Sequence, residues 1–295
     1  MHLSCNIAVI LLLASVVPLC AQEPPTFVTY THQMEEPGNL EISTYGAIGS
    51  PNGGSPDGGH GFYGSATEFE YGLRGWWTTE FYLDGQATTH DSIIFTGFRY
   101  ENRFRLVPRE HWINPVFYVE FEDTSGADKS LLEVVDNDSQ ADLAVPNAAA
   151  RLEKQRELET KLILGSYAKG WTIAENFIAE KNLAHAPFEF GYAAAVTRPL
   201  ALEARAEQCT FCRENFQAGV EAYGGLGTNR DFGLPDTAHY IASLLAWSLP
   251  SGVTIKVSPG FGLTGSSLPF LLRVGVSYEI PQIGRTMRNA FRGGR

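Results

Sequence analysis

Apolar and polar side chains alternate with a period of two along most of this chain, and that alternation restricts what it can fold into. In the stretch TEFEYGLR (67–74), aromatic and aliphatic side chains occupy one parity and charged side chains the other. Successive side chains of a β-strand point to opposite faces, so each such stretch predicts a strand with one apolar and one polar face. The alternation recurs at 39–49, 76–86, 92–106, 115–124, 158–167, 171–182, 188–197, 215–224, 238–249, 253–263 and 270–280. The chain is therefore predicted to be all-β.

The lengths of these segments and of their connections indicate how the strands are arranged. Most segments are roughly ten residues long, the length with which a tilted strand crosses a bilayer. If 198–214 is one connection, the count is twelve strands. Three tight turns and both chain ends then lie on one rim of a barrel, and three long polar loops lie on the other. The segment 26–34 is a candidate extra strand at the edge, and 146–158, rich in helix-forming residues, predicts a short helix in the longest loop.

Charged side chains form continuous columns on the polar parity, opposite a parity rich in Phe, Tyr, Trp, Leu and Val. The columns contain Glu68, Glu70, Glu80, Asp84, Arg99, Glu101, Arg103, Arg105, Glu120 and Glu122. A sheet closed in lipid turns its apolar face outward and its charged face inward. The opposite orientation would place three arginines of one strand in lipid, at roughly 2–4 kcal/mol each near the midplane. The prediction is a single closed antiparallel transmembrane β-barrel, with Ile94 and Phe98 among its lipid-facing residues.

Antiparallel neighbours should place the arginines of 92–106 between two columns of carboxylates. The expected partners of Arg99, Arg103 and Arg105 are Glu80, Asp84, Glu120 and Glu122. One interpretation is a charged constriction that selects solutes by the sign of their charge. The other is a filling of ion pairs that makes a narrow barrel rigid. Reversal of Glu120 and Glu122 to Lys is expected to shift a conducting barrel toward anions and to loosen it.

The N-terminus predicts export. Residues 1–21 contain the apolar run Ile7–Val17 followed by small residues ending at Ala21, which is typical of a cleaved signal peptide. The predicted organisation is a signal peptide (1–21), an outer-membrane β-barrel (22–280) and a basic C-terminal tail (281–295). The net charge of −11 leaves no basic stripe for phosphates and argues against a nucleic-acid partner.

The hairpin rhythm and the closing segment SPGFGLTGSSLPFLLRVGVSYEI resemble Gram-negative outer-membrane β-barrels, among them transporter-like barrels of phenol-degradation operons. This resemblance implies an outer-membrane location, assembly by the barrel-assembly machinery and contact with outer-membrane lipid. Such barrels usually end on an aromatic residue that the machinery recognises. This chain instead continues past Ile280 with PQIGRTMRNAFRGGR.

Cys209 and Cys212 are the only cysteines left after cleavage, in the sequence CTFC. In an oxidising compartment this pair predicts a disulfide. A single CxxC is at most half of a zinc site, and no cofactor or metal is expected. The acidic stretch 122–142 lacks the central Gly and terminal Glu of a calcium loop.

No GxSxG, HExxH, P-loop or dinucleotide-binding motif marks an active site, and His90 with Ser92 is weak evidence for a hydrolase. The sequence therefore predicts that the protein is not an enzyme and that the barrel lets a small solute pass, as a porin-like or transporter-like channel. Two alternatives stay open: a non-conducting structural barrel of the outer membrane, and an exported soluble β-sandwich that binds a ligand.

Overall fold

A computed structural model describes residues 24–49, 62–88, 91–128, 146–184, 187–203 and 209–285. The predicted signal peptide, His90, most of the acidic stretch and the end of the basic tail lie outside these residues. The strands are β1 (Leu40–Gly49), β2 (Phe62–Arg74), β3 (Trp77–Thr88), β4 (Ile93–Arg105), β5 (Asn114–Ser125), β6 (Lys154–Ala168), β7 (Trp171–Asn182), β8 (Phe188–Pro199), β9 (Phe216–Thr228), β10 (His239–Ser248), β11 (Val253–Gly262) and β12 (Phe270–Ile280). Short helices accompany them, among them α3 (Asn147–Ala150) and η1 (Arg213–Asn215).

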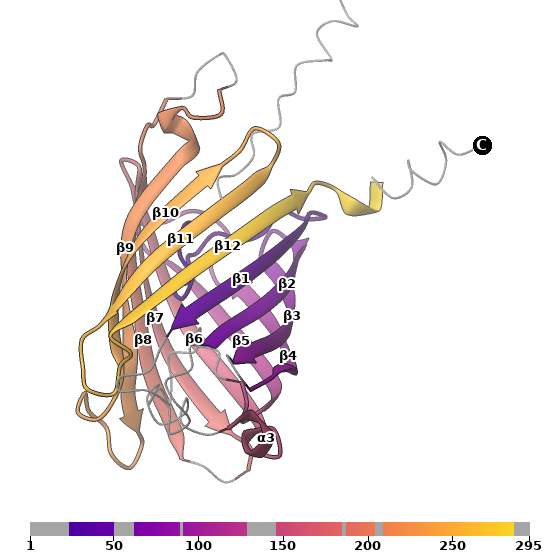
Figure 1. Ribbon diagram of the computed structural model, residues 1–295. Helices are drawn as coiled ribbons and strands as arrows, with labels where there is room; N and C mark the ends of the chain where they lie inside the picture. Colours follow the sequence, from indigo (N-terminus) through magenta and orange to yellow (C-terminus); the bar gives the residue numbers. More distant parts are fainter. Residues whose placement is uncertain are drawn as a thin grey trace, which may run out of the picture.

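The strands form one closed antiparallel barrel, which confirms the predicted fold class (Figure 1). Each strand pairs with its neighbours in sequence, and β1 closes the barrel on β12 from Leu40↔Ile280 to Gly49↔Leu271. Closure removes the exposed edges that an open sheet would offer for aggregation. It also rules out the alternative of a β-sandwich.

The connections separate into two rims, as their lengths predict. The β6–β7 turn needs only two residues, since Lys169 (φ 52°) and Gly170 (φ 83°) both adopt the positive φ of a hairpin turn that matches strand twist. The rim with this turn also holds the start of β1 and the end of β12, and α3 lies at the opposite rim (Figure 1). The connection after β8 contains η1 and adds no strand among the described residues.

The outward face of the barrel is apolar and the inward face is polar, as the alternation predicts. On β4 the outward Tyr100 is 46% exposed, whereas the neighbouring inward Glu101 is 0% exposed. Large apolar side chains are exposed on the outward parity of most strands. Water does not tolerate so large a continuous apolar surface, whereas lipid does. Among the described residues, no helix is long and apolar enough to cross a membrane.

A bulge and a short helix correct two predictions. The β3–β4 register shifts between Asp84 and Gly85, which leaves Thr96 as an extra residue on β4. The extra residue reverses the parity, so that Phe95 points outward and Ile94 does not share the outward face of Phe98. The helix predicted over 146–158 is only the single turn α3, because β6 already pairs with β5 from Lys154.

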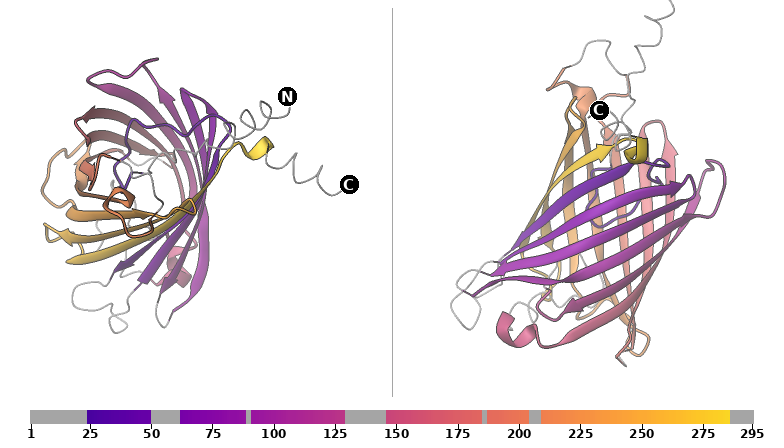
Figure 2. Two further views of the ribbon diagram at one scale, coloured as in Figure 1. Left: turned by 90° about the horizontal axis from the view of Figure 1, so that it is seen from above. Right: turned by 90° about the vertical axis from the view of Figure 1, so that its right-hand side faces the viewer.

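Residues 24–36, which we call the luminal strap, lie inside the barrel and not at a sheet edge (Figure 2). The sequence had suggested an extra strand at 26–34, but the closed β1–β12 ladder leaves no edge for one. At the rim the chain turns through Gly38, whose N–H donates to the Gly72 carbonyl (2.7 Å), and then enters β1.

Candidate functional site

Strand register places nine glutamates directly opposite one another in a single row, which we call the glutamate row. It crosses β12, β1, β2, β3, β4, β5, β6, β7 and β8 as Glu279, Glu41, Glu70, Glu80, Glu101, Glu120, Glu159, Glu180 and Glu189. All nine occupy the inward parity of their strands. Directly opposed residues on neighbouring strands are about 4.5–5.5 Å apart, so the row places carboxylates at regular, short intervals.

The row runs from one rim of the barrel to the other. Glu279 is one residue from the end of β12 on the tight-turn rim, and Glu189 is one residue from the start of β8 on the long-loop rim. Between them, Glu120 lies midway along β5. Strands of a barrel are tilted, so a row perpendicular to them winds along the barrel axis. The carboxylates therefore form a spiral along the inner wall.

Basic and tyrosine side chains flank the row and neutralise part of it. Arg103 contacts the carboxylates of Glu70 and Glu80 and lies 3.2 Å from Glu101. Arg99 forms a bidentate pair with Asp84 (3.1 and 3.2 Å) and lies 3.5 Å from Glu120. Buried charges are costly unless they are paired, so these contacts allow the row to exist in a narrow lumen.

Two further contacts differ from the expected pairing or add to it. Arg105 faces the lumen but donates to the backbone carbonyl of His32 in the luminal strap (3.3 Å). Lys161, which the sequence did not single out, lies 2.7 Å from Glu159 and over the ring of Tyr118 at 4.1 Å. The inward-facing tyrosines complete the network. The Tyr82 hydroxyl lies within hydrogen-bond distance of Glu80 (2.6 Å) and Glu101 (3.0 Å), and Tyr118 donates to Glu120 (2.9 Å).

Two groups of carboxylates have the spacing of a cation site. The oxygens of Glu68, Glu70 and Glu80 lie within 4.8 Å of one another, as do those of Glu120, Glu122 and Glu159. Arg103 already contacts two members of the first group, and Arg99 and Lys161 each contact a member of the second. Side-chain cations therefore already compensate part of the negative charge of both groups.

A cavity of about 330 Å³ separates the charged wall from the luminal strap. Its polar lining includes Glu41, Glu68, Glu70, Glu80, Glu279, Arg99, Arg103, Arg105, Lys161 and Lys256, and the strap contributes Glu35 and Glu36. Burial, reinforced by the nearby carboxylate of Glu279, raises the pKa of Glu35 from 4.5 to about 7. The strap thus narrows the lumen and leaves this cavity beside the part of the glutamate row formed by Glu279, Glu41, Glu70 and Glu80.

Sequence reasoning placed part of the row on the inward face and missed the rest. It missed Glu41, Glu159, Glu180, Glu189, Lys161 and Lys256, although each has the inward parity of a segment with weaker alternation. Glu279 lies on the polar parity of the clear alternation at 270–280 but was not among the predicted site residues. Their parity was the signal that could have identified them as inward-facing. Parity does not give the register of the strands, and the register is what places these residues in one row with Glu80 and Glu101.

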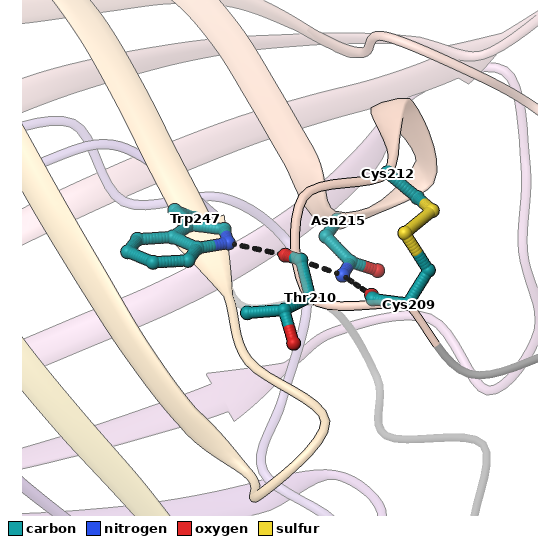
Figure 3. The surroundings of a disulfide bond; sticks show 5 residues. All are labelled: Cys209, Thr210, Cys212, Asn215 and Trp247. Carbon is teal, nitrogen blue, oxygen red and sulfur yellow. Dashed lines mark hydrogen bonds between the residues drawn. A yellow bond between two sulfur atoms is a disulfide. The ribbon is translucent and has the colours of Figure 1, made fainter.

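Cys209 and Cys212 form a disulfide on the tight-turn rim (Figure 3). The loop that they close folds against the outside of β10, where Trp247 donates to the carbonyl of Thr210 (2.9 Å) and stacks on Phe211 at 4.7 Å. Asn215 donates to the carbonyls of Cys209 and Thr210. The disulfide therefore fixes an aromatic contact outside the lumen.

Ser92, considered above with His90 as a hydrolase pair, has a structural contact. Its hydroxyl oxygen accepts from Asn147 (3.0 Å), and Asn147 also donates to Thr88 (3.1 Å). These bonds hold α3 on the β3–β4 connection at the long-loop rim. His90 lies outside the described residues.

No protein-family model matches the chain, and no curated protein is similar to it in sequence. Solved structures are similar in fold. The COG4313 outer membrane channel from Pseudomonas putida F1 superposes with a TM-score of 0.54 at 10% identity, over 84% of this chain and 98% of that one. The KdgM porin in complex with disordered oligogalacturonate gives 0.49 at 8% identity, over 81% and 98%. The chain has the fold of an outer-membrane β-barrel.

Proposed function

We propose that this protein is an outer-membrane channel that passes small solutes through its lumen and favours cations. The observation that carries the proposal is the glutamate row, because it offers carboxylates along the inner wall from one rim to the other. Rings of one sign of charge select ions in narrow pores, and low-dielectric walls strengthen their field. The lipid-facing outer wall supports the outer-membrane location.

The lining of the cavity also favours cations. Besides Glu35, six glutamates line it (Glu36, Glu41, Glu68, Glu70, Glu80 and Glu279) against five basic residues (Arg99, Arg103, Arg105, Lys161 and Lys256). The basic side chains are largely committed to carboxylates or rings of the wall. A mobile cation in the passage therefore meets more uncompensated negative than positive charge.

Reversal potentials in planar bilayers under a KCl gradient test the proposal. Wild type should prefer K⁺, and Glu68→Lys should shift the preference toward Cl⁻, because Glu68 lines the cavity and the substitution reverses its charge. Glu203→Lys is the matched control, since Glu203 is exposed in the connection after β8, does not line the cavity and should leave selectivity unchanged. Reversal of Glu120 and Glu122 is less informative, because Glu120 also neutralises Arg99.

The alternative is a non-conducting structural barrel. If folded wild type and Glu68→Lys both fail to conduct, the channel proposal is wrong and the structural barrel replaces it. An anion preference in wild type would refute the role given to the glutamate row, even in a barrel that conducts.

A further inference from the structure

The luminal strap is held by side chains of the barrel wall that bind its backbone. One carboxylate oxygen of Glu221 accepts from the N–H groups of both Val28 (2.9 Å) and Thr29 (2.6 Å). The amide of Asn176 binds both backbone groups of Tyr30, accepting from its N–H (2.7 Å) and donating to its carbonyl (2.9 Å). These bonds recognise an extended main chain whichever side chains it carries, and the side chains of Tyr30 and His32 add contacts with Glu101 and Glu110 (2.9 Å each).

The wall residues that make these bonds are buried and well placed for the purpose. Glu221 is 0% exposed and Asn176 is 1% exposed, and they project inward from β9 and β7. A buried carboxylate without a partner is strongly unfavourable, and two N–H groups of the strap supply partners for Glu221. The strap therefore supplies the hydrogen-bond donors of one Glu221 oxygen in this structure.

The inner wall also provides room for the strap. A Cβ added to Gly165 would lie 2.1 Å from Nδ1 of His32, so only glycine fits there while His32 is in place. Val28 packs into a buried apolar cluster that includes Ile178, Tyr223 and Leu271. Glycine and apolar side chains thus shape a groove that follows the strap.

The strap is not part of the sheet. The backbone groups of 28–35 that bind the barrel wall bind side chains of the wall, namely those of Glu221, Asn176, Arg105 and Thr78. The twelve strands close their ladder on one another without it. Its departure therefore breaks no strand pairing and leaves the groove available.

We propose that Glu221 and Asn176 form a binding site for extended peptide backbone on the inner wall, and that the luminal strap occupies this site as an exchangeable internal ligand. A peptide in extended form binds the same groove when the strap leaves it. The occupied groove narrows the passage beside the glutamate row, so exchange also changes the bore of the barrel.

The test uses the full-length chain with Val28→Pro and Thr29→Pro, which removes the two N–H donors to Glu221 and leaves the wall unchanged. A fluorescently labelled peptide of residues 24–36 (PPTFVTYTHQMEE) is titrated into the detergent-solubilised protein, and binding is followed by anisotropy. The tethered strap has an effective concentration in the millimolar range. Wild type should therefore bind the peptide at least tenfold more weakly than the proline variant.

The controls separate backbone recognition from nonspecific binding. Thr26→Pro, which changes the strap outside the clamped residues, should behave as wild type. A peptide N-methylated at Val28 and Thr29 should bind the proline variant at least tenfold more weakly than the parent peptide, which corresponds to about 1.4 kcal/mol. Asn176→Ala and Glu221→Ala together, added to the proline variant, should weaken its binding of the parent peptide by the same factor. Glu221→Gln, which keeps an acceptor oxygen, should retain most of that binding.

Equal binding by wild type and the folded proline variant would overturn the proposal, as would equal binding of the N-methylated peptide. If the alanine variant does not fold, the N-methylated peptide still tests the same bonds from the ligand side. Block of single-channel current by the peptide rests on the proposed channel function, whereas anisotropy does not. Peptide binding without conductance would count against the channel alone.

Discussion

Replacing Arg103 by Met tests whether the ion pairs of the lumen hold the barrel together. Arg103 contacts three carboxylates whose side chains are 15%, 1% and 0% exposed, those of Glu70, Glu80 and Glu101. Breaking a buried ion pair by removing one partner costs about 3–5 kcal/mol, against about 0–1 kcal/mol for a surface pair. The register places these glutamates opposite one another. We therefore expect Arg103→Met to lower the free energy of unfolding by an amount near the upper end of the buried-pair range, about 5 kcal/mol.

The assay is urea unfolding in lipid vesicles, followed by tryptophan fluorescence at neutral pH and again in acid. Protonated carboxyls no longer need a cation. The difference in free energy of unfolding between wild type and Arg103→Met should therefore become smaller in acid. Arg105→Met is the matched control from the same face of β4, since Arg105 donates to one backbone carbonyl at 3.3 Å. It should lose less stability and show little change with pH. A loss below about 1 kcal/mol for Arg103→Met, typical of an exposed pair, would refute the reasoning.

Three further outcomes are expected. Tyr100→Arg on the outward face should cost roughly 2–4 kcal/mol in lipid, measured by the same unfolding assay, and a neutral result would count against a lipid-facing wall. Burial raises the pKa of Glu35 from 4.5 to about 7, so the native state binds its proton more tightly and this group's contribution to stability should fall as pH rises from 4.5 to 7; Glu35→Gln should flatten that slope, and an unchanged slope would exclude Glu35 as its source. Thiol labelling of unreduced, denatured protein should find no free Cys209 or Cys212, and reduction should change the fluorescence of Trp247 without unfolding the barrel.

The alternation in the sequence determined which way each side chain points. A period of two is local, because each residue's face follows from its neighbour's, and the cost of an arginine in lipid decides which face is inside. This reasoning placed Glu80, Arg99 and Glu101 on the inward face and Tyr100 on the outward face, as the structure has them. It failed at Ile94, where one extra residue in a bulge reversed the parity.

The number of strands also followed from the sequence, because a barrel with both chain ends on one rim needs an even count. Twelve satisfied the lengths of the connections, and the structure has twelve. The short helix was predicted in the right loop but was too long, since pairing of Lys154 with Ser125 extends β6 into the helix-forming stretch.

Only the tertiary structure decided the register and the content of the lumen. Parity gives the face of a residue but not its height, so no local pattern shows that Glu279 and Glu189, on strands far apart in the sequence, belong to one row with Glu120. Height depends on turn geometry and bulges summed around the whole barrel. The luminal strap was hidden for a related reason: Glu221 and Asn176 bind its backbone, and backbone recognition leaves no signature in the side chains of the strap.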